Sequence, residues 1–402
     1  MTSALPQRIT AAGSRILSVD AVRGAVMILM AIDHIRDFIN SAAMSFSPTD
    51  LSRTTAPIFF TRWITHFCAP VFALTAGMGA FFWAQRRTKA QLSRFLLTRG
   101  LWLMVLEVTV LRFILYLDFG FTHTLFILTV LWMLGLCMVV LAALVRLPPR
   151  LLAALSIAVV AAHNLFDGVQ AAQFGRLAWI WDILHQQGVF RVGGDSVLTA
   201  YPLIPWFAVM ACGYCLGQAF LWDDARRRRF LLRLGVALSA AFVVLRALNV
   251  YGDPARWSFE RSSMFTVLSF LNTTKYPPSL EFLLMTLGPA LLAMAWLERA
   301  RLSSTNPLIV FGRVPFFFFL LHLAVIHALT IAMNFIRYGN ASFLFTPAPS
   351  MGGPRQTFPP DYGYGLWVVY AVWIAVIVML YPLCRWYAQL KQRRRYWWLS
   401  YL

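Results

Sequence analysis

The chain has 402 residues and a formal net charge of +19, and 59% of its residues are hydrophobic against only 13% that are charged. Soluble domains carry roughly 25% charged residues, so a chain this apolar cannot cover its surface in water and is excluded from the soluble classes. Its basic residues stand in short runs between apolar blocks, which excludes nucleic acid as the expected partner and favours anionic lipid headgroups.

Ten apolar blocks divide the chain, and each is long enough, at roughly 20 residues, to span a bilayer. They predict an all-α integral membrane bundle of about ten transmembrane helices, folded as a single domain over residues 1–402. The blocks lie at residues 16–40, 56–84, 95–117, 121–145, 151–168, 199–222, 230–250, 279–299, 307–335 and 364–390.

Basic residues concentrate in every second gap between the blocks and at both ends of the chain. Because cytoplasmic loops are enriched in Lys and Arg, this alternation predicts that residues 1–15 and the basic segment 391–402 lie in the cytoplasm. An even number of spans satisfies the prediction, and we expect a multi-pass protein of the cell inner membrane. Three outer gaps are long enough to carry functional residues, although they show no obvious secondary structure. They cover residues 169–198, 251–278 and 336–363.

The first block carries charges that a lipid-facing span would not tolerate. Asp20 and Arg23 are three residues apart, can pair at the cytoplasmic end, and argue against a cleavable signal peptide. Asp33, His34 and Asp37 follow near the outer end. Charges inside a membrane cost at least ~2.5–3.5 kcal/mol each, so they normally face the bundle interior. We expect His34 as a catalytic base or nucleophile oriented by Asp33 or Asp37, with an ion-pair cluster at the helix end as the alternative.

The second block starts on the outer side, so His66 enters the membrane at the depth of His34. Two histidines and two carboxylates at one level make an acid–base centre, with His66 as a second acid or base or as a partner of an oxyanion. Taken alone, His66 is equally a hydrogen-bonded histidine of the interface. Pro70 is expected to kink or open the helix beside it. His123 begins the fourth block on the outer side and is a candidate for the same pocket.

Other polar residues of the blocks allow two interpretations. Glu107 in the third block is a functional candidate by its depth, but it is equally a neutral group or a partner of Arg112. His322 and His327 are five residues apart and favour a role in helix packing. The Cys212–Cys215 pair is flanked by glycines, which also favours helix packing over a metal site, and we expect no metal.

Two further residues are candidates for binding an acceptor on the outer side. Trp206 falls at an outer interface, where an aromatic belt is expected and stacking on a sugar is the alternative. Lys275 precedes the eighth block and is placed to reach an acidic acceptor.

Several stretches together resemble one known family. They are Ser18-Val-Asp-Ala-Val-Arg-Gly24 with Asp33-His34, Thr65-His-Phe-Cys-Ala-Pro-Val-Phe72 with Ala76-Gly77, Tyr201-Pro-Leu-Ile-Pro-Trp206 with Gly213-Tyr-Cys-Leu-Gly217, Thr274-Lys-Tyr-Pro-Pro-Ser279 with Thr286-Leu-Gly-Pro289, and Asn306-Pro-Leu-Ile-Val-Phe-Gly-Arg313 with Leu320-Leu-His322. On these stretches, which span nearly the whole chain, the sequence resembles the bacterial branch of the heparan-alpha-glucosaminide N-acetyltransferase catalytic-domain family. Its opening also resembles the membrane acyltransferases that modify surface polysaccharides, in which Asp-x-x-Arg-Gly precedes a histidine.

The resemblance implies transfer of an acetyl group from cytoplasmic acetyl-CoA, as co-substrate, to an amine or hydroxyl of a sugar or glycan on the outer side. It also implies cationic partners for the CoA phosphates on the inner side, for which Arg23, Arg86 and Arg313 are candidates from their position. Human-type members carry a histidine in the loop between the first two helices, whereas residues 39–58 here contain none. Heparan itself is therefore not the expected acceptor.

Two rival functions stay open from the residues alone. A transporter or flippase of a lipid-linked sugar or small solute would also keep charges in broken, Pro- and Gly-containing helices, although no inverted repeat is visible. A non-enzymatic scaffold would have no use for the Asp, His and Arg residues of the first two blocks. Small-residue surfaces permit a homodimer without requiring one.

Overall fold

The computed structural model describes residues 17–117, 125–351, 353–394 and 396, and helices dominate it. Each of the ten apolar blocks contains helix. The elements are α1 (Leu17–Ile39), α2 (Ala56–Trp63) with η2 (Ile64–Phe67) and α3 (Cys68–Ala84), α4 (Lys89–Leu106) with η3 (Glu107–Leu111) and α5 (Arg112–Tyr116), α6 (Val130–Leu144), α7 (Pro149–Ala162) with η4 (His163–Phe166), α9 (Trp206–Leu216) with η6 (Gly217–Leu221), α10 (Asp224–Leu248), α12 (Leu280–Leu297), α13 (Pro307–Arg313), α14 (Pro315–Tyr338) and α15 (Leu366–Arg393).

Six helical segments among the described residues are long and apolar enough to cross a membrane. They are the helix from Ala56 to Ala84, the helix from Pro149 to Phe166, α10, α12, α14 and α15. The other blocks are shorter, as in α6 and α9 with η6, or carry more charge, as in α1 and α4. The structure confirms a mostly helical membrane protein, while the count of about ten spans and the side of the termini stay predictions.

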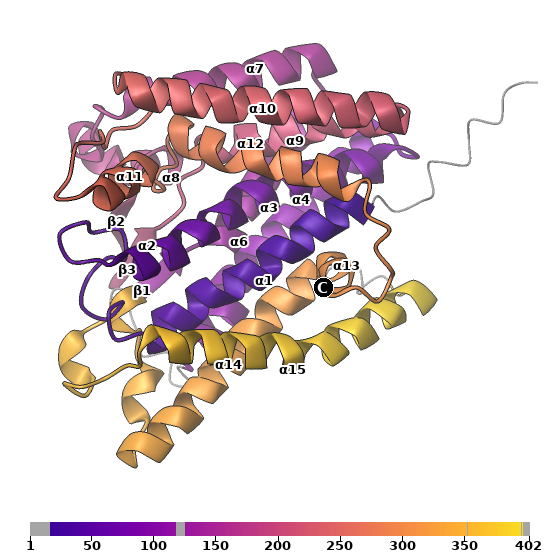
Figure 1. The fold of residues 1–402 in the computed structure, drawn as a ribbon. Coiled ribbons are helices and arrows are strands. Elements are labelled where there is room, and N and C mark those ends of the chain that lie inside the picture. The colour runs from indigo at the N-terminus through magenta and orange to yellow at the C-terminus, as the bar shows by residue number, and fades with distance from the viewer. Residues whose placement is uncertain (1–16, 118–124, 352, 395, 397–402) are drawn as a thin grey trace, which may run out of the picture.

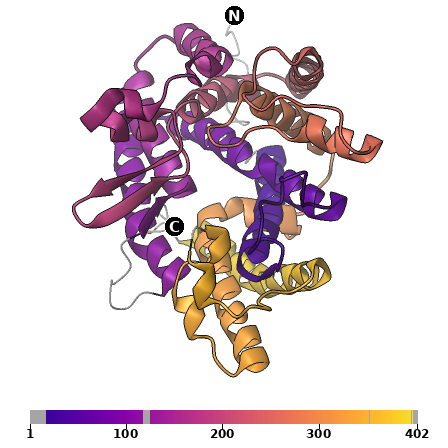
Figure 2. The same cartoon turned by 90° about the vertical axis from the view of Figure 1, so that its left-hand side faces the viewer.

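Figure 1 shows how these helices are arranged. Helices α7 and α10 lie along one edge of the bundle, α14 and α15 lie along the opposite edge, and α1 runs between them. The first residues of α1 and the last residues of α15 lie at one end. Figure 2 looks onto the other end, where the short strands and the loops before α2 and α15 gather. The charged half of α1 that holds His34 therefore points toward the end with the strands.

Glycines allow two helix pairs to approach very closely. A side chain at Gly24 of α1 would overlap the carbonyl oxygen of Leu308 in α13, and one at Gly213 of α9 would overlap the carbonyl oxygen of Leu74 in α3. Such small-residue contacts are a common way for membrane helices to pack. The glycine-rich surroundings of the Cys212–Cys215 pair therefore serve packing inside this chain, as the sequence predicts.

Prolines interrupt two of the helical segments. Pro70 lacks the N–H that would bond the carbonyl group of His66, and the backbone just before it tightens into the 3-10 turn η2. The segment therefore departs from regular α-helix beside Pro70, where the sequence predicts a kink or an opening. Val314 leaves the helical region directly before Pro315, so the ninth block is divided into α13 and α14.

Glu107 caps a neighbouring helix. Its carboxylate accepts hydrogen bonds from the backbone N–H groups of Thr129, Leu131 and Trp132, at 2.8, 3.1 and 3.2 Å, where α6 begins. The first N–H groups of a helix have no partner within the helix, and a negative charge there also suits the helix dipole. The structure thus gives Glu107 a capping role, which the sequence analysis does not predict.

We expect Glu107→Ala to destabilise the protein by about 1–3 kcal/mol, because buried N–H groups of α6 lose their acceptor. Glu107→Gln keeps one acceptor oxygen and should lose less. The measurement is thermal unfolding in detergent, with Thr109→Ala as the control, since the Thr109 hydroxyl bonds only within its own helix and is exposed. Equal stability of Glu107→Ala and Thr109→Ala would contradict the capping role.

A small sheet corrects the prediction of an all-α fold. The strands β1 (Leu125–Leu128), β2 (Gly188–Val192) and β3 (Asp195–Thr199) form a sheet of order β1-β3-β2, with β1 parallel and β2 antiparallel to β3. The hairpin turns at Gly193-Gly194, where Gly193 has a positive φ, as two-residue hairpins require. The outer gaps also hold short helices, which the sequence analysis does not predict. These are η5 (Ala171–Leu177), α8 (Ala178–Leu184), α11 (Ser263–Leu271), η7 (Ser342–Phe345), η8 (Pro349–Met351) and η9 (Arg355–Thr357).

Candidate active site

A cavity of about 910 Å³ lies at the end of the bundle that holds the strands, and the charged end of α1 forms one wall. Further walls come from α2 and η2, from the β-strands, from residues 43–49, and from the loop between α11 and α12. Its volume is at the upper end of the range for small-molecule sites, which is roughly 300–1,000 Å³. The charged and histidine side chains that line it are Asp33, His34, Arg36, Asp37, Arg62, His66 and Lys275.

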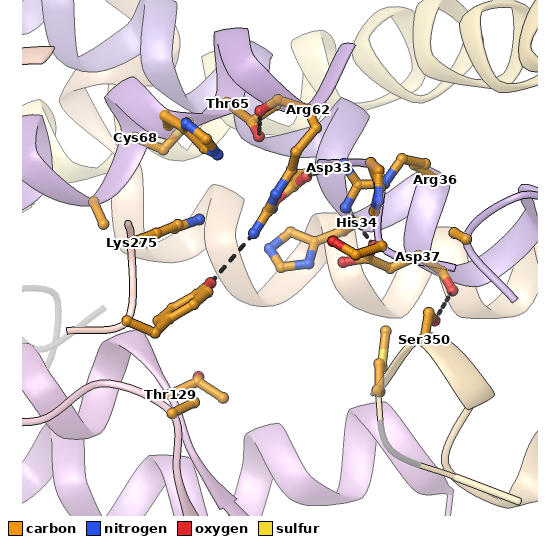
Figure 3. Close-up of a pocket in the computed structure, with 18 of the residues that line it drawn as sticks. Asp33, His34, Arg36, Asp37, Arg62, Thr65, Cys68, Thr129, Lys275 and Ser350 are labelled. Atoms are coloured by element: carbon orange, nitrogen blue, oxygen red, sulfur yellow. Dashed lines mark hydrogen bonds and ion pairs between the residues drawn. The ribbon is translucent and has the colours of Figure 1, made fainter. Parts of the chain in front are cut away.

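Two arginines bind the carboxylates of α1. Arg36 is 3% exposed, and its two terminal nitrogens contact Asp33 at 2.8 Å and Asp37 at 2.6 Å. Arg62, which projects from α2, donates a hydrogen bond to the other carboxylate oxygen of Asp33 (Figure 3). Guanidinium–carboxylate bonds are among the strongest in proteins, and these fix both acids in the cavity wall.

The expected pairing of His34 with a carboxylate does not form. The His34 ring instead packs against the rings of Phe319 and His322 in α14, with centroid distances of 6.5 and 5.2 Å. Among the residues that the structure describes, none hydrogen-bonds a ring nitrogen of His34, and Asp33 and Asp37 pair with arginines instead. The half-buried His34 ring projects into the cavity (Figure 3), where its nitrogens are available to a ligand.

His66 enters the same cavity from the turn η2. Its side chain is 2% exposed and packs against the ring of Phe282 in α12, with the centroids 5.3 Å apart. Its Nδ1 atom is buried and accepts or donates no hydrogen bond within the described chain. The structure thus brings His34 and His66 to one cavity, together with Asp33 and Asp37.

The loop between α11 and α12 supplies Lys275 and Tyr276. The Tyr276 hydroxyl lies 3.5 Å from Arg62 and 3.3 Å from the hydroxyl of Tyr201, which also lines the cavity. Burial raises the pKa of the Tyr276 phenol, but the nearby Lys275 and Arg62 cations outweigh it and hold that pKa below its usual value. Sequence reasoning missed Arg36, Arg62 and both tyrosines. The position of Arg62 four residues before His66 is the signal that could have placed it in the site.

Arg23 and Arg313 meet at the opposite end of α1. Arg23 contacts Asp20 at 3.4 Å and donates to the carbonyl oxygen of Gly312 at 3.2 Å, while Arg313 lies 4.0 Å from the second oxygen of Asp20. The expected Asp20–Arg23 pair is therefore present, and Arg313 joins it. Arg86 is exposed in the turn after α3.

Trp206, which the sequence predicts to bind the acceptor, does not line the cavity. Trp206 is fully buried and packs behind Tyr201, with ring centroids 5.9 Å apart, so it neither lines the cavity nor forms part of an outer aromatic belt. His123 lies outside the described residues. Of the remaining histidines, His327 bonds the backbone carbonyl oxygens of Ile114 and Leu344, which confirms its packing role.

Histidines that line a cavity beside arginine-bound carboxylates, in a helical membrane protein, are the kind of arrangement that acid–base or nucleophilic group transfer requires. The model of one family, described as "Heparan-alpha-glucosaminide N-acetyltransferase, catalytic", matches residues 15–252 of the chain. The chain belongs to this family of transmembrane acetyltransferases. Comparison with curated proteins gives no match. The matched segment includes His34, Arg62 and His66 and ends before Lys275.

Proposed function

We propose that the protein transfers an acetyl group from cytoplasmic acetyl-CoA to an amine or hydroxyl of a sugar or glycan on the outer side of the cell inner membrane. The observation that carries the proposal is the cavity in which His34 offers ring nitrogens without a protein partner, in a chain of the acetyltransferase family. The proposal includes a single domain over residues 1–402, about ten spans and both termini in the cytoplasm.

The chemistry suits the lining residues. As the acceptor nitrogen or oxygen attacks the thioester carbonyl, its proton passes to His34, the C–S bond breaks, and the CoA thiolate leaves. Alternatively, His34 takes the acetyl group first and passes it on. The negative charge that develops on the carbonyl oxygen needs nearby hydrogen-bond donors or cations. His66, Arg62 and Lys275 line the same cavity and are the candidates for this role. Asp33 and Asp37 act by holding Arg36 and Arg62 in place.

Acetyl-CoA would supply the activated acyl group, and its phosphates need cations on the cytoplasmic side. Arg23 and Arg313 fit that requirement in kind, and Asp20 holds them together. Arg86 is a third candidate, and its exposed side chain can reach a phosphate only at the surface. His34 follows Asp20 by 14 residues on one continuous helix, which corresponds to a rise of ~21 Å. Helix α1 would thus connect a donor site on the inner side with an acceptor site on the outer side.

The test uses purified protein in lipid nanodiscs with radiolabelled acetyl-CoA and a panel of amino sugars and glycans. Wild type is compared with His34→Ala, His66→Ala and, as a matched control, His185→Ala, because His185 lies outside the cavity lining. We expect label on the acceptor, or on the protein, with wild type and His185→Ala, and its loss with His34→Ala. If acetyl-CoA neither binds nor turns over with any acceptor, the proposal fails and transport of a sugar or small solute becomes the leading function.

A further inference from the structure

We propose that Lys275 forms an anion-binding subsite of the cavity and that the sugar bound there carries a carboxylate or phosphate group. The identification of this sugar as the acyl acceptor rests on the proposed function. Its binding does not, because it requires neither acetyl-CoA nor turnover.

Lys275 is a buried cation that forms no direct ion pair with a described residue, although the Asp33 carboxylate lies near enough to feel its charge. Its side chain is 9% exposed and lines the cavity. Within the described chain its ammonium group forms no ion pair and no hydrogen bond, and its nearest aromatic contact is the ring of Tyr276 at 5.2 Å. Burying an unpaired charge is costly, so an anionic ligand group beside Lys275 would relieve that cost.

Among the charged residues of the described lining, Lys275 is the one that forms no ion pair with another lining residue. Three cations, Arg36, Arg62 and Lys275, stand against two carboxylates, Asp33 and Asp37. Both arginines are bound to those carboxylates. One positive charge is therefore left over in this lining, and it belongs to the residue without an ion pair.

The backbone around Lys275 is held firmly, so the side chain is not a loose surface lysine. The carboxylate of Asp253 accepts hydrogen bonds from the backbone N–H and hydroxyl of Thr274, at 2.8 and 2.7 Å, and from the hydroxyl of Ser279, at 2.6 Å. His163 contacts the carbonyl oxygen of Pro278 at 2.8 Å. A preorganised charge loses little freedom when it binds a ligand, which favours recognition.

The subsite lies beside the reactive groups. Figure 3 shows Lys275 and Arg62 projecting into the same space, with His34 on its other side. An anionic group anchored at Lys275 would therefore leave the rest of the sugar facing the histidines.

The experiment measures binding without acetyl-CoA. Calorimetry on the full chain in nanodiscs, at constant ionic strength, compares cellobiose with its uronic acid and its 6′-phosphate, and lactose with the same two derivatives. Wild type is compared with Lys275→Met, with Lys275→Arg, and with Lys89→Met as the matched control, because Lys89 is exposed at the start of α4 and lies outside the cavity lining. We expect an acidic derivative to bind wild type roughly 10- to 100-fold more tightly than its neutral parent, the value of one charge-assisted hydrogen bond.

Lys275→Met should abolish this preference, whereas Lys275→Arg and Lys89→Met should retain it. Preference for the uronic acid would identify a carboxylate ligand, and preference for the phosphate would identify a phosphorylated one. If neutral and acidic sugars bind wild type equally, or if Lys275→Met keeps the preference, the inference is wrong. If Lys275 acts only on the oxyanion of the transition state, Lys275→Met would keep any preference for acidic sugars. That result would leave the proposal of acyl transfer unaffected.

Discussion

Replacing His34 with alanine is expected to lower the turnover number for acetyl transfer by roughly 10²- to 10⁴-fold, the usual contribution of a general base. The reason is that no other described side chain of the cavity offers an imidazole with both nitrogens clear of protein hydrogen bonds and exposed to the cavity. His66 is almost fully buried, and its Nδ1 faces no solvent. We therefore expect a smaller loss for His66→Ala than for His34→Ala.

Single-turnover measurements with radiolabelled acetyl-CoA check this expectation and separate two mechanisms. If His34 carries the acetyl group, labelled protein accumulates without acceptor and His34→Ala abolishes the label. If His34 acts only as a base, the wild-type protein stays unlabelled without acceptor, and His34→Ala loses only the formation of acetylated product. His322→Phe serves as the control for packing, because it keeps a ring beside His34. A His34→Ala enzyme that retains more than about a tenth of the wild-type turnover would contradict general-base catalysis by this residue.

Arg246→Met is expected to destabilise the protein by about 3–5 kcal/mol, because it leaves a buried carboxylate without its partner. Arg246 in α10 is 1% exposed and Glu281 in α12 is 2% exposed, and their charged atoms lie 2.9 Å apart. The remaining N–H groups of Arg246 bond backbone carbonyl oxygens in and beside α11. These belong to Ala255, Ser269, Phe270 and Asn272, at 2.8, 3.1, 2.9 and 3.0 Å.

All five N–H groups of this guanidinium are used, a pattern that lysine cannot reproduce with three donors on a point charge. Arg246→Lys should therefore also lose stability. Thermal unfolding in detergent measures the effect, with the exposed Arg233→Met on the same helix as the control, expected within about 0.5 kcal/mol of wild type. If Arg246→Met unfolds at the temperature of Arg233→Met, this network does not stabilise the outer loop.

The Arg246 network also bears on the site. Asn272, whose carbonyl oxygen Arg246 binds, and Lys275 both line the cavity and lie in the same loop. Damage to the network should therefore weaken ligand binding as well as stability. The sequence does not reveal this, because Arg246 and Glu281 are 35 residues apart and lie in different apolar blocks.

Two short-range signals in the outer gaps could have predicted the hairpin and a short helix that the sequence analysis does not expect there. The Gly193-Gly194 pair separates two short segments that contain valine, phenylalanine and threonine, and such a glycine pair between strand-forming residues is a recognisable hairpin signal. In the same way, Ser262 stands at the cap position of α11, where its hydroxyl accepts from the N–H of Phe265 at 3.3 Å. Both signals involve residues close together in the sequence, so the hairpin and the helix α11 were predictable without the tertiary structure. The parallel pairing of β1 with β3 is different, since it joins residues about 70 positions apart, from Leu125 to Ser196.

The sequence by itself determined that this is a helical membrane protein. The hydrophobic blocks, the basic runs and the intramembrane charges are local properties, and their preference for lipid or water does not depend on the tertiary fold. The sequence also predicted that His34 and His66 lie at one depth, since rise along a helix follows from residue number, and both histidines line the cavity. Only the tertiary structure decided which partners those charges choose. Arg36 and Arg62 pair with Asp33, whereas His34 does not. Glu107 accepts hydrogen bonds from the start of α6, and Lys275 forms no direct ion pair with a carboxylate in the described chain. Each outcome depends on how helices distant in sequence face one another, and packing sets that orientation.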